Sequence, residues 1–173
     1  FAVTSRNTNS AFAIYQWRDA AQALQANLRY DGSSQYGGRT TGSLSYGYRV
    51  APTLRLTAGA STGFKPPSFN DLYYPGFSTP DLTPETARNF ELGAHWNGVV
   101  EGARLNARAI AYRNDVDQLI VYRCDVSFVC TPQNVDRATL SGVTLGLDVD
   151  AGTLTVAGSL DFGNPRDDAT GNL

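Results

Sequence analysis

Residues 59–93 read GASTGFKPPSFNDLYYPGFSTPDLTPETARNFELG and point most directly to the architecture of the chain. Both ends of this stretch alternate between apolar and polar side chains, as β-strands with one apolar face do. Between these ends lie five of the eight prolines of the chain, and proline cannot donate a hydrogen bond to a strand ladder. The stretch therefore predicts two strands joined by a long irregular loop at residues 63–85.

The same alternation recurs along the chain and predicts eight strands. Residues 54–61, for example, place Leu54 and Leu56 on one side and Arg55 and Thr57 on the other, which is the period of a half-apolar strand. The remaining strands are expected at about residues 11–18, 23–31, 43–50, 89–96, 105–122, 132–149 and 154–162. The facing of the first of these strands is left open by its sequence. We therefore expect an all-β, antiparallel meander.

The predicted connections alternate in length. Short links are expected at residues 18–21, 50–53, 97–102 and 151–153, and longer ones at 31–39, 63–85, 124–130 and 163–172. In an antiparallel meander this alternation puts the short turns at one end of the sheet and the long loops at the other. Outer-membrane β-barrels have this asymmetry, whereas soluble β-sandwiches do not show such strict alternation.

Composition narrows the class of protein. Of 173 residues only 17% are charged and the net charge is -2, which argues against a nucleic-acid binder. The longest apolar run, Ala11–Tyr15, is far shorter than the roughly 20 residues of a membrane-spanning helix, but a barrel strand needs only one apolar face. Because the chain contains no methionine, we expect it to be a processed product or part of a longer protein.

Aromatic side chains near the strand ends support a membrane sheet. Lipid-facing aromatics are expected in two belts, one at each interface. The candidates are Trp17, Tyr48 and Trp96 at the short-turn ends, and Tyr30, Phe64, Tyr112 and Phe162 at the opposite ends. Cross-strand packing in a soluble sheet is the alternative. On the other face, the residues expected to line the lumen include Arg29, Arg49, Arg55, Glu91, His95 and Asp148.

One predicted strand is too long for a bilayer. Residues 105–122 exceed the roughly 9–11 residues of a tilted crossing, so the charged segment 113–117 should lie at or above the outer interface and the hairpin should form a tall ribbon. Cys124 and Cys130 lie at its tip and are expected to form a disulfide, because cell-surface compartments are oxidising. A metal or redox pair is the alternative, but the spacing is not C-x-x-C.

Few residues suggest chemistry beyond binding. His95 is the only histidine, and we interpret it as a hydrogen-bonded lumenal side chain rather than a catalyst, so no catalytic residue is predicted. Calcium is conceivable at the loop carboxylates, but these lack the spacing of a dedicated site, so no metal and no cofactor is predicted. The carboxylates are Asp71, Asp81, Asp115, Asp117 and Asp125. The aromatics of the long loop either anchor it on the rim or contact a bulky ligand.

Several motifs resemble those of TonB-dependent outer-membrane receptors. Residues 61–73, STGFKPPSFNDLY, resemble their strand-to-loop motif. Residues 79–85, TPDLTPE, followed by FELG at 90–93, resemble their "N-P-x-L-x-P-E … E-x-G" signature, with Thr79 where the family commonly has asparagine. Residues 112–120, YRNDVDQLI, resemble the corresponding hairpin of the cobalamin (vitamin B12) receptors in this family. So do residues 138–149, although Thr144 replaces the glutamate of their "G-V-E".

The resemblance covers about residues 11–162 and has clear implications. It implies a 22-stranded barrel in the bacterial outer membrane, an N-terminal plug inside it and energy delivered by TonB. Eight strands would supply about a third of that barrel, so we expect residues 1–173 to be a barrel segment, with the plug and TonB box outside this chain. The implied activity is uptake of a scarce nutrient, most directly cobalamin, with a ferric siderophore as the alternative. The expected ligand-contacting residues are Phe69, Tyr73, Tyr74, Phe77 and Phe128.

Two other classes of protein compete with this interpretation. Eight strands can close by themselves, so the chain could be a complete small barrel acting as an adhesin or membrane anchor. An outer-membrane enzyme is the third class, but a single histidine without an evident nucleophile disfavours it.

Overall fold

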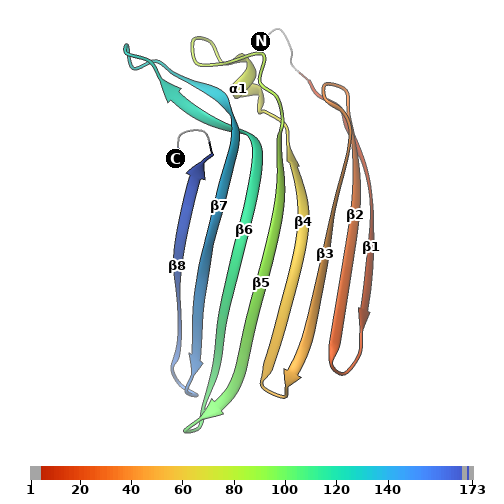
Figure 1. Ribbon diagram of the computed structural model, residues 1–173, viewed down its shortest axis with the longest axis vertical. Coiled ribbons are helices and arrows are strands. Elements are labelled where there is room, and N and C mark those ends of the chain that lie inside the picture. The colour runs from red at the N-terminus through yellow and green to blue at the C-terminus, as the bar shows by residue number, and fades with distance from the viewer. Residues whose placement is uncertain (1–4, 169–170, 172–173) are drawn as a thin grey trace.

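The computed structural model describes residues 5–168 and residue 171, with the side chain of Asp136 left out. Eight antiparallel strands form one sheet in the order β1-β2-β3-β4-β5-β6-β7-β8 (Figure 1). The all-β antiparallel meander is thereby confirmed. The strands are β1 (Thr8–Arg18), β2 (Gln22–Ser33), β3 (Gly37–Ala51), β4 (Leu54–Lys65), β5 (Glu85–Val100), β6 (Ala103–Cys124), β7 (Cys130–Asp150) and β8 (Thr155–Asp167).

One predicted loop is much shorter than expected. β2 and β3 stay paired up to Ser33 and Gly37, so the link expected at residues 31–39 is a tight turn. The Ser33 hydroxyl accepts hydrogen bonds from the amides of Gln35 and Tyr36 at 3.3 and 3.4 Å, and Gly37 takes a φ of 71° that glycine adopts without strain. The strict alternation of link lengths is therefore wrong. The two ends of the sheet also differ because the strands are unequal in length: β6 has 22 residues, whereas β1 has 11.

The strand register assigns side chains to two faces. In an antiparallel pair, directly opposed residues project to the same side. On the apolar face, Trp17 opposes Leu24, which in turn opposes Tyr46, so the facing of β1 is settled. On the polar face, Gln16 opposes Gln25, and their amides are hydrogen-bonded at 3.0 Å.

One aromatic residue lies on the opposite face from that expected. Tyr112 opposes Glu91 and donates a hydrogen bond to Asp161 at 3.2 Å, so it belongs to the polar face and not to the outer lipid-facing belt. The cause is strand parity, because Ala111 and Arg113 occupy the apolar side in this part of β6. Trp17, Tyr48, Trp96, Tyr30, Phe64 and Phe162 keep the apolar parity expected of them.

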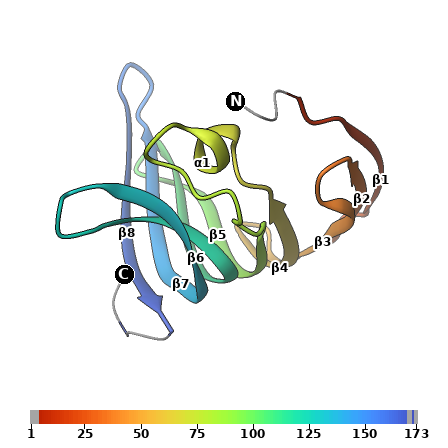
Figure 2. The same cartoon turned by 90° about the horizontal axis from the view of Figure 1, so that it is seen from above.

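The long loop contains a short helix that periodicity does not reveal. α1 (Phe69–Tyr73) begins at a capping box in which Ser68 and Asp71 exchange hydrogen bonds. This pairing satisfies amides that a helix start leaves without partners. Figure 2 shows the sheet as an open arc with α1 lying over its concave side. Five residues are too few for an amphipathic repeat, so the loop reads as irregular in the sequence.

Burial is concentrated beneath this loop. The buried hydrophobic side chains of the described residues are Leu72, Leu82, Val116, Val135 and Ala138. The first two come from the loop, and the other three come from the upper parts of β6 and β7. Val116 opposes both Ala87 and Ala138 and lies on the polar face. The loop therefore covers the polar face, which is the concave one.

The sheet does not close within the chain. β1 pairs only with β2 and β8 only with β7 among the described residues, so the alternative of a complete eight-stranded barrel is wrong. Within the same residues, no helix is long and apolar enough to cross a membrane.

Candidate functional site

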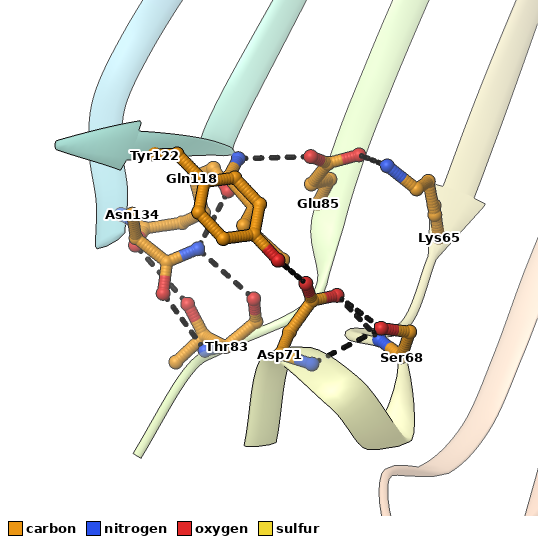
Figure 3. A network of polar contacts seen from close by, with 9 residues as sticks. Lys65, Ser68, Asp71, Thr83, Glu85, Gln118, Tyr122 and Asn134 are labelled. Carbon is orange, nitrogen blue, oxygen red and sulfur yellow. Dashed lines mark hydrogen bonds and ion pairs between the residues drawn. The ribbon is translucent and has the colours of Figure 1, made fainter. Parts of the chain in front are cut away.

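The long loop, residues 66–84, is tied to its own strands by Glu85. Glu85 as a residue is only 7% exposed, and its carboxylate lies 3.1 Å from the ammonium group of Lys65, its cross-strand partner. Its second oxygen accepts a hydrogen bond from the Ile120 amide at 2.8 Å (Figure 3). A buried carboxylate is stable only when it is paired in this way. Glu85 thus links β4, β5 and β6 at the base of the loop.

Asn134 attaches the descending half of the loop to the β6–β7 ribbon. Its side-chain amide donates to the carbonyl oxygens of Thr83 and Gln118 at 3.0 and 2.7 Å and accepts from the Thr83 amide at 2.9 Å. Gln118 has a φ of 59°, a left-handed conformation that costs free energy for a non-glycine residue. Its side chain also accepts a bond from the Thr83 hydroxyl at 3.1 Å. These bonds together hold the strained residue in place.

Asp71 attaches α1 to the same ribbon. The Tyr122 hydroxyl donates a hydrogen bond to one oxygen of Asp71 at 2.9 Å, and the other oxygen accepts from the amide and hydroxyl of Ser68. Burial opposes ionisation of Asp71, but these hydrogen bonds to its charged form outweigh that effect and lower its pKa. The long loop is therefore held at three points (Figure 3).

The predicted ligand-contacting aromatics fall into three groups. Phe69 and Tyr73 face the segment before β1 and the β2–β3 turn, respectively. The Arg6 guanidinium lies 5.0 Å from the Phe69 ring centroid, and Gln35 donates to the Tyr73 hydroxyl at 3.2 Å. These two rings therefore anchor the loop.

The other three predicted aromatics are exposed. The rings of Tyr74 and Phe77 lie 6.1 Å apart, with about half of each residue open to solvent. Phe128 lies at the tip of the β6–β7 hairpin and is 88% exposed. Figure 2 shows this tip reaching past β8, away from α1. The structure therefore does not bring the five predicted residues together.

The tip of the β6–β7 hairpin is cross-linked and capped. The predicted disulfide between Cys124 and Cys130 is present. Within the loop it closes, the Asp125 carboxylate accepts hydrogen bonds from the amides of Ser127 and Val129 at 2.8 and 3.0 Å. Val126 and Phe128 are left almost fully exposed.

All six residues predicted to line the lumen share the polar face. Arg49 opposes Arg55, Arg55 opposes His95, and Arg29, Glu91 and Asp148 have the same parity. Arg108, which the sequence alone does not single out, opposes His95 and forms an ion pair with Asp148 at 3.1 Å. His95 lies 3.3 Å from the Thr57 hydroxyl. That these residues contact a plug stays a prediction.

Four of the five loop carboxylates serve structural roles, whereas Asp81 is exposed. Asp115 pairs with Arg113 at 2.9 Å and Asp117 with Arg137 at 3.0 Å, while Asp71 and Asp125 accept the hydrogen bonds described above. Among the described residues, no three His, Cys, Asp or Glu side chains are grouped as metal ligands.

Sequence reasoning misses the residues that dock the loop. Glu85, Asn134, Gln118 and Tyr122 act through contacts between segments far apart in the chain, which strand periodicity does not report. The Ser68-x-x-Asp71 spacing is the one local signal, because it is the pattern of a capping box.

Sequence comparisons place the chain among known proteins. The family model described as TonB dependent receptor-like, beta-barrel matches residues 1–173. Over 96% of its own length, the chain is 29% identical to the vitamin B12 transporter BtuB of Photobacterium profundum. It is 27% identical to the BtuB of Vibrio vulnificus, again over 96% of its own length. It spans only 28% and 27% of these two relatives.

Solved structures share the fold at lower identity. The copper transporter OprC superposes with a TM-score of 0.79 at 20% identity, covering 96% of this chain and 29% of that protein. The siderophore receptor PirA from Acinetobacter baumannii gives 0.74 at 19% identity, with coverage of 96% and 29%. At these identities the likeness concerns the fold alone.

Proposed function

Because the chain belongs to the TonB dependent receptor-like β-barrel family, we propose that it forms part of the wall of an outer-membrane receptor that takes up cobalamin with energy from TonB. The family is one of receptors and transporters rather than enzymes. Uptake makes and breaks no bond, so the receptor's work is recognition at the outer surface followed by gated passage.

The observation that carries this proposal is the two-faced, open sheet. One face is apolar through the middle of each strand, and the other presents hydrogen-bonded polar side chains such as Gln16, Gln25, Asn27 and Ser43. An apolar outside with a polar inside is the pattern of a membrane barrel. The unpaired edges of β1 and β8 require further strands, since lipid cannot satisfy backbone amides and carbonyls. We propose that these strands belong to the same barrel.

The choice of cobalamin rests on the two vitamin B12 transporters described above, which match the chain over nearly all of its length. A ferric siderophore is the second candidate, because the fold is shared with a siderophore receptor, and loops rather than the fold select the ligand.

The five residues predicted to contact the ligand differ in solvent exposure. Tyr74 and Phe77 form an exposed pair on the docked loop, and we propose that this pair covers apolar surface of the ligand. Phe128 would act separately, from the ribbon tip. Phe69 and Tyr73 would act indirectly, by holding the loop against Arg6 before β1 and Gln35 in the β2–β3 turn.

Uptake by cells tests the proposal. A strain that lacks the whole receptor should take up cyanocobalamin more slowly, and the complete receptor supplied in trans should restore uptake. The double variant Tyr74→Ala/Phe77→Ala should weaken cyanocobalamin binding about 10-fold or more, since buried aromatic contacts dominate such interfaces.

Asp81→Ala is the matched control, because Asp81 is exposed in the same loop and serves in none of the contacts that dock it. It should leave binding unchanged. Normal cyanocobalamin uptake in the deletion strain, together with lost ferric-siderophore uptake, would replace cobalamin by a siderophore. Normal uptake of both would overturn the nutrient-receptor proposal.

A further inference from the structure

The apolar face of the sheet is hollowed between β3 and β5. The hollow measures about 590 Å³, which is within the range of about 300–1,000 Å³ that ligand pockets occupy. Its floor contains Ala58 and Ala60 on β4. Larger side chains on the two neighbouring strands form its walls: Leu44 and Tyr46 on β3, and Phe90 and Leu92 on β5. We call this hollow the outer groove.

Two arginines lie at the long-loop end of the outer groove. Arg113 lines the groove and is the cross-strand partner of Phe90. Arg88 precedes Phe90 by two residues on β5, so it projects to the same face and lies diagonally beside Arg113. From Phe90 to Trp96, the residues of β5 on this face are all apolar. The two arginines therefore lie where the apolar band of the sheet ends and charged side chains begin.

The positive charge at this end of the groove is not fully compensated. Arg113 pairs with Asp115 through Nε and one terminal nitrogen, but its side chain is 61% exposed. Arg88 is exposed and forms no ion pair or hydrogen bond within the described part of the chain. Asp115 opposes Arg88 across the strands, but its carboxylate already accepts from Arg113 and from the Thr139 hydroxyl. Two arginines thus share one carboxylate.

The wider charged band of the same face also has an excess of one positive charge. It contains four arginines and three aspartates: Arg88, Arg113, Arg137 and Arg166 with Asp115, Asp117 and Asp168. Neighbouring carboxylates therefore do not neutralise the pair at the groove. An anionic group from outside the sheet would.

An apolar groove that ends at incompletely paired arginines fits one class of molecule. Guanidinium groups bind phosphate through two parallel hydrogen bonds. A free phosphate would leave the groove walls uncovered, although Leu44 and Leu92 are 53% and 66% exposed. A neutral hydrocarbon would cover these walls but leave Arg88 without a counter-charge. A lipid with a phosphate-bearing headgroup satisfies both the walls and the arginines.

We infer that the outer groove binds a lipid of the outer leaflet, with an acyl chain over Ala58 and Ala60 and a phosphate-bearing headgroup held by Arg88 and Arg113. The inference rests on the proposed function, because the apolar face must be the outside of an outer-membrane barrel for lipid to reach it. The long-loop end is then the extracellular one, which places the two arginines at the level of the outer headgroups.

Native mass spectrometry of the full-length receptor in detergent tests this inference with three probes. Dioleoylphosphatidic acid carries both acyl chains and a phosphate, and it should bind one site at least about tenfold more tightly than dioleoylglycerol, which has the same chains without phosphate. Each arginine near an anionic lipid surface contributes roughly fivefold. Glycerol 3-phosphate has the phosphate without the chains, and at the same concentration it should not displace the phosphatidic acid.

Charge variants test the headgroup end of the groove. Arg88→Gln/Arg113→Gln should lower the affinity for dioleoylphosphatidic acid at least about tenfold, because both arginine contributions are lost. Arg166→Gln is the control, since Arg166 is exposed on the same face but does not line the groove. Its affinity should stay within about twofold of the unmodified receptor.

Variants that fill the groove test the acyl-chain end. Ala60→Phe should lower the same affinity at least about fourfold, which corresponds to about one methylene group that is no longer buried. Ala58→Phe serves the same purpose if the first variant assembles poorly. Ala94→Phe adds the same ring to this face outside the groove, and it should leave the affinity within about twofold.

Several results would overturn the inference. These are equal binding of dioleoylglycerol, displacement by glycerol 3-phosphate, and variants of the arginines or of Ala60 that bind phosphatidic acid as tightly as their controls. A receptor dimer that Ala60→Phe dissociates would also overturn it, because a second copy of the chain would then occupy the groove.

Cyanocobalamin binding, measured on the same preparation, distinguishes this failure from failure of the proposed function. Cyanocobalamin binding without selective binding of phosphatidic acid would refute only the lipid site. Selective binding of phosphatidic acid by a receptor that does not bind cyanocobalamin would refute only the cobalamin assignment.

Discussion

Replacing Glu85 by alanine should lower the free energy of local opening at the base of the long loop by about 2 kcal/mol. The change removes the acceptor of the Ile120 amide, and leaving a part-buried donor unsatisfied costs about 1–2 kcal/mol. It also removes the ion pair with Lys65, whose side chain is 71% exposed, so that pair contributes about 0.5 kcal/mol at most after solvent screening. A change of about 1.4 kcal/mol alters an equilibrium constant tenfold, so hydrogen exchange at the Ile120 amide should accelerate about 30-fold.

Hydrogen exchange read by mass spectrometry on the full-length receptor measures this effect in peptides that contain Ile120. Glu85→Gln keeps an acceptor for the amide and loses only the ion pair, so exchange should accelerate less than about threefold. Asp81→Ala, in the same loop, is the control and should change nothing. The role of Glu85 as the link between three strands would be wrong in either of two cases. The Ile120 peptides of Glu85→Ala would exchange within about twofold of the rate in the unmodified receptor, or no faster than those of Glu85→Gln.

Three further predictions concern the docked loop and the ribbon. Asn134→Ala removes three hydrogen bonds at once and should release the loop at a cost of about 2–3 kcal/mol, seen as cleavage of residues 66–84 by added protease on intact cells; an unchanged cleavage rate would contradict this. Cys124→Ser/Cys130→Ser should destabilise the ribbon tip by about 2–3 kcal/mol at most, with faster exchange at residues 125–129 and an unaltered barrel; slower or equal exchange at the tip would count against the cross-link's role. Hydrogen bonds hold the pKa of Asp71 below its ordinary value. The contribution of Asp71 to the stability of the docked loop is therefore complete above about pH 4 and is lost as the pH falls through the lowered folded-state pKa. A spin label in the loop should therefore gain mobility below about pH 4, and Asp71→Asn should remove that dependence.

The sheet is predictable because strand patterning is local. Alternation along residues 54–61 and 89–96 is visible in the sequence, and each correctly assigned strand also assigns its faces, since side chains repeat with period two. For this reason alternation alone is enough to place Arg49, Arg55 and His95 together on the polar face. The same reasoning misplaces Tyr112, because its strand has apolar residues on both sides, with Ile110 and Ala111 adjacent.

The contents of the long loop are not predictable in the same way. Five prolines mark an interruption of the sheet but do not say how the interruption packs. Proximity in sequence groups Phe69 and Tyr73 with Tyr74 and Phe77 as ligand contacts. The structure separates them, since the first pair contacts Arg6 before β1 and Gln35 in the β2–β3 turn, whereas the second pair faces solvent.

Residue order along single strands is enough to specify the architecture: an antiparallel sheet with one apolar face, a tall cross-linked ribbon and the motifs of the family. The docking of the loop and the side-by-side placement of Arg49, Arg55 and His95 within the polar face depend instead on tertiary contacts. Glu85 with Ile120, Asn134 with Thr83, and Arg55 with Arg108 are separated by many residues, and the register between strands is what brings them within reach. The stretch at residues 59–93 thus identifies the sheet, while its contacts with β6 and β7 determine the shape of its loop.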